Sequence, residues 1–160
     1  MLWAVLVVIC AVAIVALGSV YFTLSGQKRW YGKINRPAFT PPGKIFGLVW
    51  TVMYVLTGLS LYKFIAATVF DQYFWLVMTI FVINGILNIL WSFTFFTAHL
   101  VYGGFFVALG MALTILSLII LIIPYSVISS LLLVPYFLWI CFASYLNYQI
   151  WVENGYKLVI

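Results

Sequence analysis

The stretch LWAVLVVICAVAIVALGSVYFTL, residues 2–24, contains no charged side chain. It is long enough to cross the hydrocarbon core of a bilayer as a helix, which takes about 20 mostly apolar residues. Four further runs are similarly apolar, and of these only 44–62 carries a charge, at its first residue, Lys44. We therefore expect five membrane-spanning helices, at about 2–24, 44–62, 73–96, 102–123 and 127–152. A membrane β-barrel would instead show short segments of alternating hydrophobicity. The sequence therefore predicts an all-α integral membrane protein with one domain over residues 1–160.

The composition of the whole chain excludes other common classes. Hydrophobic residues make up 68% and charged residues 6% of the chain, against about 45–50% and 25% in soluble globular proteins. These values also exclude a disordered chain, a basic nucleic-acid-binding protein and a disulfide-rich secreted domain. We therefore expect the lipid bilayer, and no nucleic acid, to be a partner of this protein.

The first apolar run could also be a cleaved signal peptide, because Ala11-Val12-Ala13 resembles a cleavage site. However, no basic residue precedes the run, and it continues past this triplet to full spanning length. We therefore expect residues 2–24 to be retained as a helix.

The link between the first two runs, residues 25–43, is long for a helical bundle. Five of the seven basic residues of the chain lie in it or at its edge: Lys28, Arg29, Lys33, Arg36 and Lys44. Long loops tend to be functional or disordered, and the aromatic residues and three prolines of this one favour a partly folded cap. The positive-inside rule predicts that it faces the cytosol, with the amino terminus on the other side. The remaining links are short, which predicts that consecutive helices are antiparallel neighbours.

Polar side chains occur inside the third run. Asn84 and Asn88 lie one turn apart, and Trp91 follows on about the same face. Amides at this depth must face the bundle interior. Interhelical hydrogen bonds of this kind contribute about 0.6–2 kcal/mol, and residue type alone favours this structural role over ligand binding.

Aromatic residues recur at helical spacing on two other runs. They are Phe46, Trp50 and Tyr54 on the second run, and Tyr136 and Trp139, continued by Ala143 and Asn147, on the fifth. Pro135 lies just upstream in the fifth run and is expected to kink it. An aromatic cavity with a few polar groups suits a large, flat, mostly apolar ligand. The alternative role for tryptophan is anchoring at the membrane interface, which we expect for Trp3, Trp75 and Trp151.

Catalytic chemistry has little support in the sequence. The two carboxylates, Asp71 and Glu153, are expected at opposite membrane edges, so they cannot form an acid–base pair. His99, the only histidine, could be an axial haem ligand but is more typical of a surface residue. Cys10 and Cys141 match no metal or redox spacing. We expect no metal site and no required cofactor.

Three blocks of the chain resemble the TspO/MBR family, the tryptophan-rich sensory and translocator proteins. They are Trp30-Tyr31 with NRPAFTPPGKIFGLVWTVMY (35–54), NGILNILWSFTFF (84–96), and PYFLW (135–139) with FASYLNYQIW (142–151). The likeness extends over nearly the whole chain, including the number of spans and the long first loop. It implies a five-helix bundle with a pocket capped by that loop.

The resemblance also implies a ligand class, namely porphyrins such as protoporphyrin IX and haem. The matching positions are Tyr31, Pro42, Phe46, Trp50, Asn84, Asn88, Trp91, Trp139, Ala143 and Asn147, and helical spacing adds Tyr54. We expect these residues to bind a tetrapyrrole ligand for sensing, sequestration or transport. One alternative is light-dependent porphyrin degradation, for which the resemblance makes Trp50 and Trp139 the catalytic candidates. A second is a membrane scaffold, and a homodimer is expected by analogy.

Two positions depart from the family pattern. Phe39 stands where the family usually has tryptophan, which removes one indole from the cap. Val152 stands where the vertebrate sterol motif has arginine, which argues against sterol binding through that motif. A bacterial cell membrane is therefore the expected location.

Overall fold

The computed structural model describes residues 2–26, 30–68 and 72–157. This part of the chain is helical, and its loops contain no strand. The helices are α1 (Leu2–Gly26), α2 (Gly43–Ala67), α3 (Phe74–Ser92), the π-helical turn η2 (Phe93–Thr97), α4 (Val101–Ile122), α5 (Val127–Leu131) and α6 (Val134–Glu153). They form five segments long and apolar enough to span a membrane, with η2 continuing α3 and α5 preceding α6. The predicted fold class is confirmed, whereas Lys28, Arg29 and Asp71 lie outside the described residues.

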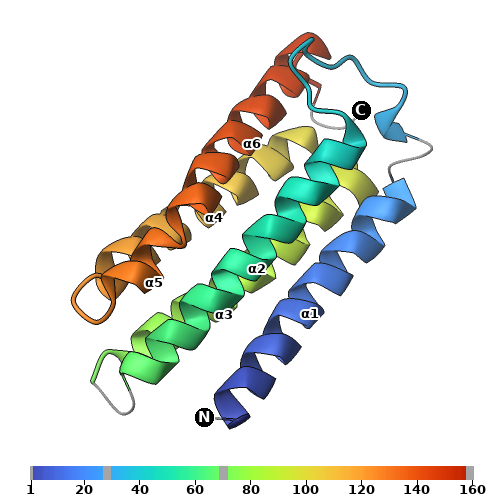
Figure 1. Cartoon of the computed structure of the whole chain (residues 1–160). Coiled ribbons are helices and arrows are strands. Elements are labelled where there is room, and N and C mark those ends of the chain that lie inside the picture. The colour runs from blue at the N-terminus through green and yellow to red at the C-terminus, as the bar shows by residue number, and fades with distance from the viewer. Residues whose placement is uncertain (1, 27–29, 69–71, 158–160) are drawn as a thin grey trace.

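The five spans lie side by side, with the amino terminus at one end and the first loop at the other (Figure 1). Helix α1 packs against both α2 and α3, α3 packs on α4, α4 packs on α6, and α2 closes the ring against α5 and α6. The consecutive helices α2 and α3 are also in contact, but their backbones do not approach each other closely. Among the described residues these two helices meet mainly through side chains, such as Trp50 with Trp91, whose ring centroids are 5.6 Å apart. These bulky rings fill the space between α2 and α3.

The close packing of α1 against α3 and η2 depends on glycine residues. A Cβ atom at Gly26 would overlap the carbonyl oxygen of Phe96 in η2, and one at Gly85 of α3 would lie 2.9 Å from Cγ2 of Val15. Only glycine allows backbones to approach so closely. These contacts place the carboxyl-terminal half of α1 against α3 and η2.

The fifth span is interrupted rather than gently kinked. Helix α5 ends at Leu131, and α6 begins at Val134 with Pro135 in its first turn. Proline fits there because the first turn of a helix needs no N–H donor. The predicted distortion is confirmed. Helix α5 is joined to α2 by reciprocal hydrogen bonds, since the Ser60 hydroxyl donates to the Ser129 carbonyl (2.8 Å) and the Ser129 hydroxyl donates to the Ser60 carbonyl (2.6 Å).

Candidate functional site

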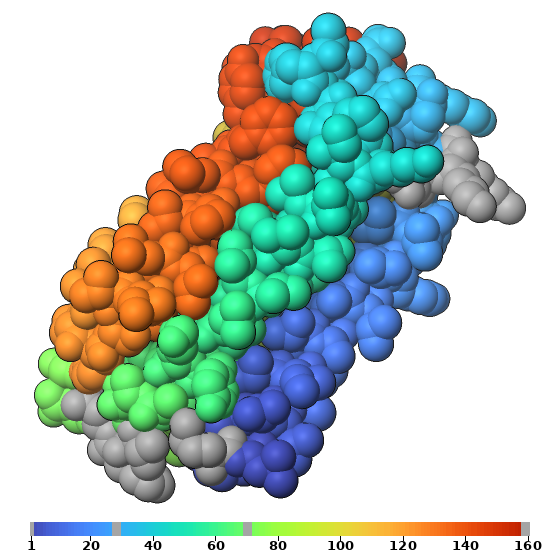
Figure 2. All heavy atoms as spheres, viewed as in Figure 1, coloured from blue at the N-terminus to red at the C-terminus, as the bar shows by residue number. Residues whose placement is uncertain are grey.

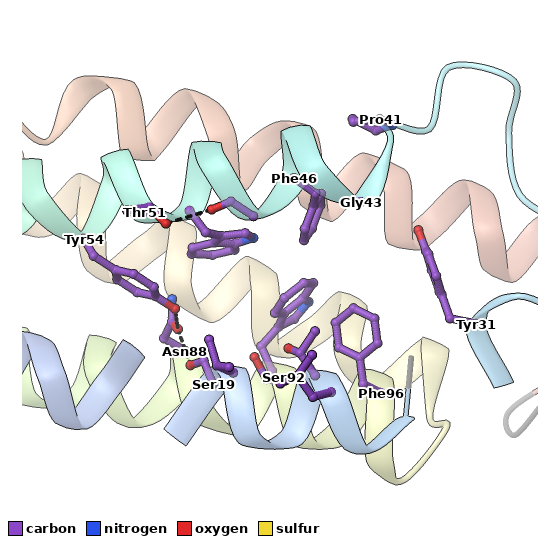
Figure 3. A pocket seen from close by; sticks show the side chains of 16 residues that line it. Ser19, Tyr31, Pro41, Gly43, Phe46, Thr51, Tyr54, Asn88, Ser92 and Phe96 are labelled. Carbon is purple, nitrogen blue, oxygen red and sulfur yellow. Dashed lines mark hydrogen bonds between the residues drawn. The ribbon is translucent and has the colours of Figure 1, made fainter. Parts of the chain in front are cut away.

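A cavity of about 280 Å³ lies beneath the first loop, between α1, α2 and α3 (Figure 3). This volume is close to the lower end of the range for small-molecule sites, about 300–1,000 Å³. Its lining comes from α1 (Ser19, Val20, Thr23, Leu24), the loop (Tyr31, Pro41), α2 (Gly43, Phe46, Gly47, Trp50, Thr51, Tyr54), α3 (Asn88, Trp91, Ser92) and η2 (Phe96).

One wall of the cavity is aromatic. Phe46, Trp50 and Tyr54 share a face of α2 because they are spaced by one turn, and successive ring centroids lie 6.3 and 5.8 Å apart. Trp91 of α3 completes the wall, 6.3 Å from Phe46 in a stacked arrangement with an interplanar angle of 28°. These separations are typical of favourable aromatic pairs. The wall therefore presents flat π-surfaces to an occupant.

Two hydrogen-bond donors in this wall are unsatisfied. Nε1 of Trp50 and Nε1 of Trp91 are buried and have no hydrogen-bond partner among the described residues. Buried indole N–H groups normally find an acceptor. Nε1 of Trp139 and Nε1 of Trp151, which do not line the cavity, are unpartnered in the same way, so this feature is not specific to the cavity.

The polar floor of the cavity is centred on Asn88. Its Oδ1 accepts hydrogen bonds from the Ser19 hydroxyl (2.7 Å) and the Tyr54 hydroxyl (2.9 Å), as seen in Figure 3, and its Nδ2 donates to the Tyr136 hydroxyl (3.1 Å). One side chain of α3 thus joins α1, α2 and α6. The expected interhelical role of this amide is confirmed, and Asn88 also lines the cavity.

Asn84 joins helices through hydrogen bonds but, unlike Asn88, does not line the cavity. Its Nδ2 donates to the Thr114 hydroxyl (2.8 Å) and the Met111 carbonyl (3.3 Å) of α4, and its Oδ1 accepts from the Tyr136 hydroxyl (3.3 Å). It lies one turn beyond Asn88 and does not line this cavity. Its amide ties α3 to α4 and α6.

The first loop is folded over the cavity. Tyr31 packs its ring 5.6 Å from that of Phe96, and the Arg36 guanidinium lies 4.8 Å from the centroid of the Tyr31 ring. Burial raises the pKa of the Tyr31 phenol, and the nearby Arg36 charge opposes this rise. Near the middle of the loop, the Asn35 carbonyl accepts a hydrogen bond from Nδ2 of Asn154 (2.9 Å), which anchors the loop to the residue that follows α6. These contacts agree with the predicted cap.

His99 belongs to the support of this cap. Its ring stacks on Trp30, with centroids 4.6 Å apart and an interplanar angle of 14°. It does not line the cavity. The described residues contain no cluster of three or more metal-ligating side chains, and both cysteines are free.

The structure brings only part of the predicted ligand-binding set to the cavity. The residues that line it are Tyr31, Phe46, Trp50, Tyr54, Asn88 and Trp91. Pro42 lies between the lining residues Pro41 and Gly43 but is not itself in the lining.

The α6 residues of the predicted set lie on the other side of the aromatic wall. The ring of Trp139 is 5.4 Å from Phe46 and 6.5 Å from Trp50, and it does not reach the cavity. Ala143 and Asn147 line a separate void of about 10 Å³, which is too small for a ligand. In this structure α6 therefore supports the wall from behind.

Sequence reasoning missed the contribution of α1. Ser19 and Thr23 lie one turn apart in a run that is otherwise almost entirely apolar, and both line the cavity. Two hydroxyl residues spaced by one turn indicate that this face of the helix points into the bundle, and this spacing could have identified them. Ser92, Thr51 and Phe96 were also missed, although they lie within or beside the recognised blocks.

Comparison with known proteins agrees with this architecture. The model of the TspO/MBR family matches residues 5–152. A tryptophan-rich protein TspO of Archaeoglobus fulgidus is 35% identical over 92% of this chain and 94% of its own length, and one of Bacillus cereus is 33% identical over 86% and 88%. The translocator protein of Ovis aries is 30% identical over 86% of this chain and 82% of its own. The chain is therefore a multi-pass membrane protein that belongs to the TspO/MBR family.

Proposed function

We propose that the cavity beneath the first loop binds a porphyrin, such as protoporphyrin IX or haem, for sensing, sequestration or transport. The observation that carries this proposal is the aromatic wall of Phe46, Trp50 and Trp91 beside the cavity. A flat macrocycle can stack on such a wall. The match favours a porphyrin over a flexible lipid chain, which cannot stack.

A macrocycle would not be wholly enclosed by a cavity of about 280 Å³. Its outer edge would extend between α1 and α2, where the lining residues Leu24, Gly47 and Thr51 are exposed. Figure 2 shows this side of the molecule, with a recess bordered by α1 and the start of α2 under the loop. A ligand that is soluble in the bilayer would fit such a half-open site.

The cap offers charge complementarity to porphyrin carboxylates. The Arg36 side chain is exposed, lies against Tyr31, and makes no salt bridge with a described residue. A guanidinium at this position can pair with a propionate at the rim of the macrocycle. We further propose that this loop faces the cytosol of a bacterial cell membrane, because Lys33, Arg36 and Lys44 all lie on its side of the bundle.

The proposal is tested by titrating purified protein with protoporphyrin IX and following the Soret band. We expect saturable binding that weakens about tenfold or more in the double variant Trp50→Phe, Trp91→Phe, because two large indole surfaces are replaced by smaller rings. The matched control is Trp75→Phe, because Trp75 is 73% exposed on α3, away from the cavity. Equal affinity in the double variant and the control would refute the placement of the ligand.

A second candidate function is the light-dependent degradation of the bound porphyrin, and it can be tested on the same complex. In this reaction the photoexcited porphyrin would take one electron from the wall and be reduced by it. Ring centroids of Trp91, Trp50 and Trp139 follow one another at 5.6 and 6.5 Å, so the indole behind the wall could replace that electron. Illumination of the complex should then bleach the Soret band faster than in the Trp139→Phe variant. Bleaching equal to that of free porphyrin in detergent would leave binding as the function.

A further inference from the structure

Most polar groups that line the cavity beneath the first loop are engaged within the protein. The hydroxyls of Ser19 and Tyr54 donate to Oδ1 of Asn88, and the Thr51 hydroxyl donates to the Gly47 carbonyl of its own helix (2.9 Å). None of the lining residues carries a charge. Polar recognition of a ligand inside this cavity therefore depends on the hydroxyls that remain.

Two lining hydroxyls remain free, those of Thr23 on α1 and Ser92 on α3. Neither makes a side-chain hydrogen bond with a described residue. Ser92 is only 2% exposed, yet its hydroxyl is not among the unpartnered groups that lack accessible surface. The little surface that Ser92 exposes therefore includes the hydroxyl, and it lies in the cavity that this residue lines. A nearly buried hydroxyl without a partner is unfavourable, and a ligand with an acceptor atom would provide one.

The packing of α1 on α3 places these two hydroxyls together. The two helices run side by side in the same direction, because Ser19 bonds to Asn88 (2.7 Å) and, further along both, Gly26 packs against η2. Thr23 lies one turn beyond Ser19, and Ser92 lies one turn beyond Asn88. The free hydroxyls are therefore at the same level of the bundle, one turn nearer the first loop than the Asn88 network. In Figure 3, Ser92 lies across the cavity from α2.

We propose that the hydroxyls of Thr23 and Ser92 bind a carbonyl oxygen of the ligand, and so make the site selective for porphyrins with a peripheral carboxyl or ester group. This inference rests on the proposed function and names the contact that selects among porphyrins. A hydroxyl is a neutral donor, so it binds a carbonyl oxygen whether the group is ionised or esterified. Arg36, by contrast, favours the ionised form.

This contact also orients the macrocycle. The free hydroxyls lie at the end of the cavity that the first loop covers, and Arg36 belongs to that loop. At the other end, the polar atoms of Asn88 are already paired with side chains of α1, α2 and α6. The edge of the macrocycle that carries the carboxyl groups therefore faces the loop, and its alkyl edge faces Asn88.

The test compares three probes on the whole protein in lipid nanodiscs, each titrated by its Soret band. They are protoporphyrin IX, its dimethyl ester, and etioporphyrin, whose ring carries only alkyl groups. The double variant Thr23→Val, Ser92→Ala should bind the acid and the ester about tenfold more weakly, the effect of two neutral hydrogen bonds. Its affinity for etioporphyrin should be that of the unaltered protein, which itself should bind etioporphyrin about tenfold more weakly than the ester.

The matched control is Ser117→Ala, which removes an exposed hydroxyl of α4 outside the cavity and should leave all three affinities unchanged. An unchanged affinity of the double variant for the ester, or an equal loss for the ester and etioporphyrin, would overturn the inference. Equal affinities of the unaltered protein for the ester and etioporphyrin would overturn it as well. In these cases the proposed function stands, whereas an unaltered protein that binds none of the three probes would refute the proposed function itself.

Discussion

Replacing Asn88 with leucine tests whether the polar floor holds the bundle together. The substitution places an apolar side chain of similar size in α3 and removes both the acceptor for Ser19 and Tyr54 and the donor to Tyr136. Measured interhelical hydrogen bonds in membranes contribute about 0.6 kcal/mol on average and about 1.7 kcal/mol at most. Three such bonds give an expected loss of about 2–5 kcal/mol in the free energy of unfolding.

The assay is reversible unfolding by SDS in mixed micelles, followed by circular dichroism. Ser19→Ala removes one of the three bonds and should cost about 0.6–1.7 kcal/mol. Ser117→Ala is the matched control, because the Ser117 hydroxyl donates to the Leu113 carbonyl within its own helix (2.9 Å) and joins no two helices. If Asn88→Leu unfolds at the same SDS fraction as the Ser117 control, the network does not stabilise the bundle.

Four further substitutions test other parts of the structure. Gly26→Ala should destabilise the protein by about 1–3 kcal/mol, because its Cβ would overlap the Phe96 carbonyl, whereas Gly47→Ala meets nothing within 4 Å and should be neutral in the same SDS unfolding assay. Gly47→Phe should keep that stability but weaken protoporphyrin binding about tenfold, measured by Soret titration, because the added ring grows at the cavity edge. Arg36→Gln should weaken binding of protoporphyrin IX but not of its dimethyl ester, and an equal effect on both would exclude a carboxylate contact.

The aromatic wall illustrates how much of the site could be predicted from sequence. Phe46, Trp50 and Tyr54 share a helix face by spacing alone, and Trp91 follows Asn88 on the facing helix in the same way. Periodicity can identify such a face but not what it faces. Trp139 has equally good spacing on α6, yet the structure places it behind Phe46 and Trp50 and outside the cavity.

The sequence by itself determined the membrane class, the five spans and the break near Pro135, because these depend on local hydrophobicity and backbone chemistry. Only the tertiary structure decided that α1 packs against both α2 and α3 and supplies a wall of the cavity. Hydrophobicity cannot choose neighbours among helices that are all surrounded by lipid. That choice depends on close contacts such as Gly26 with Phe96, on bulky rings such as Trp50, and on the hydrogen bonds of Asn88, which form only when the helices come together.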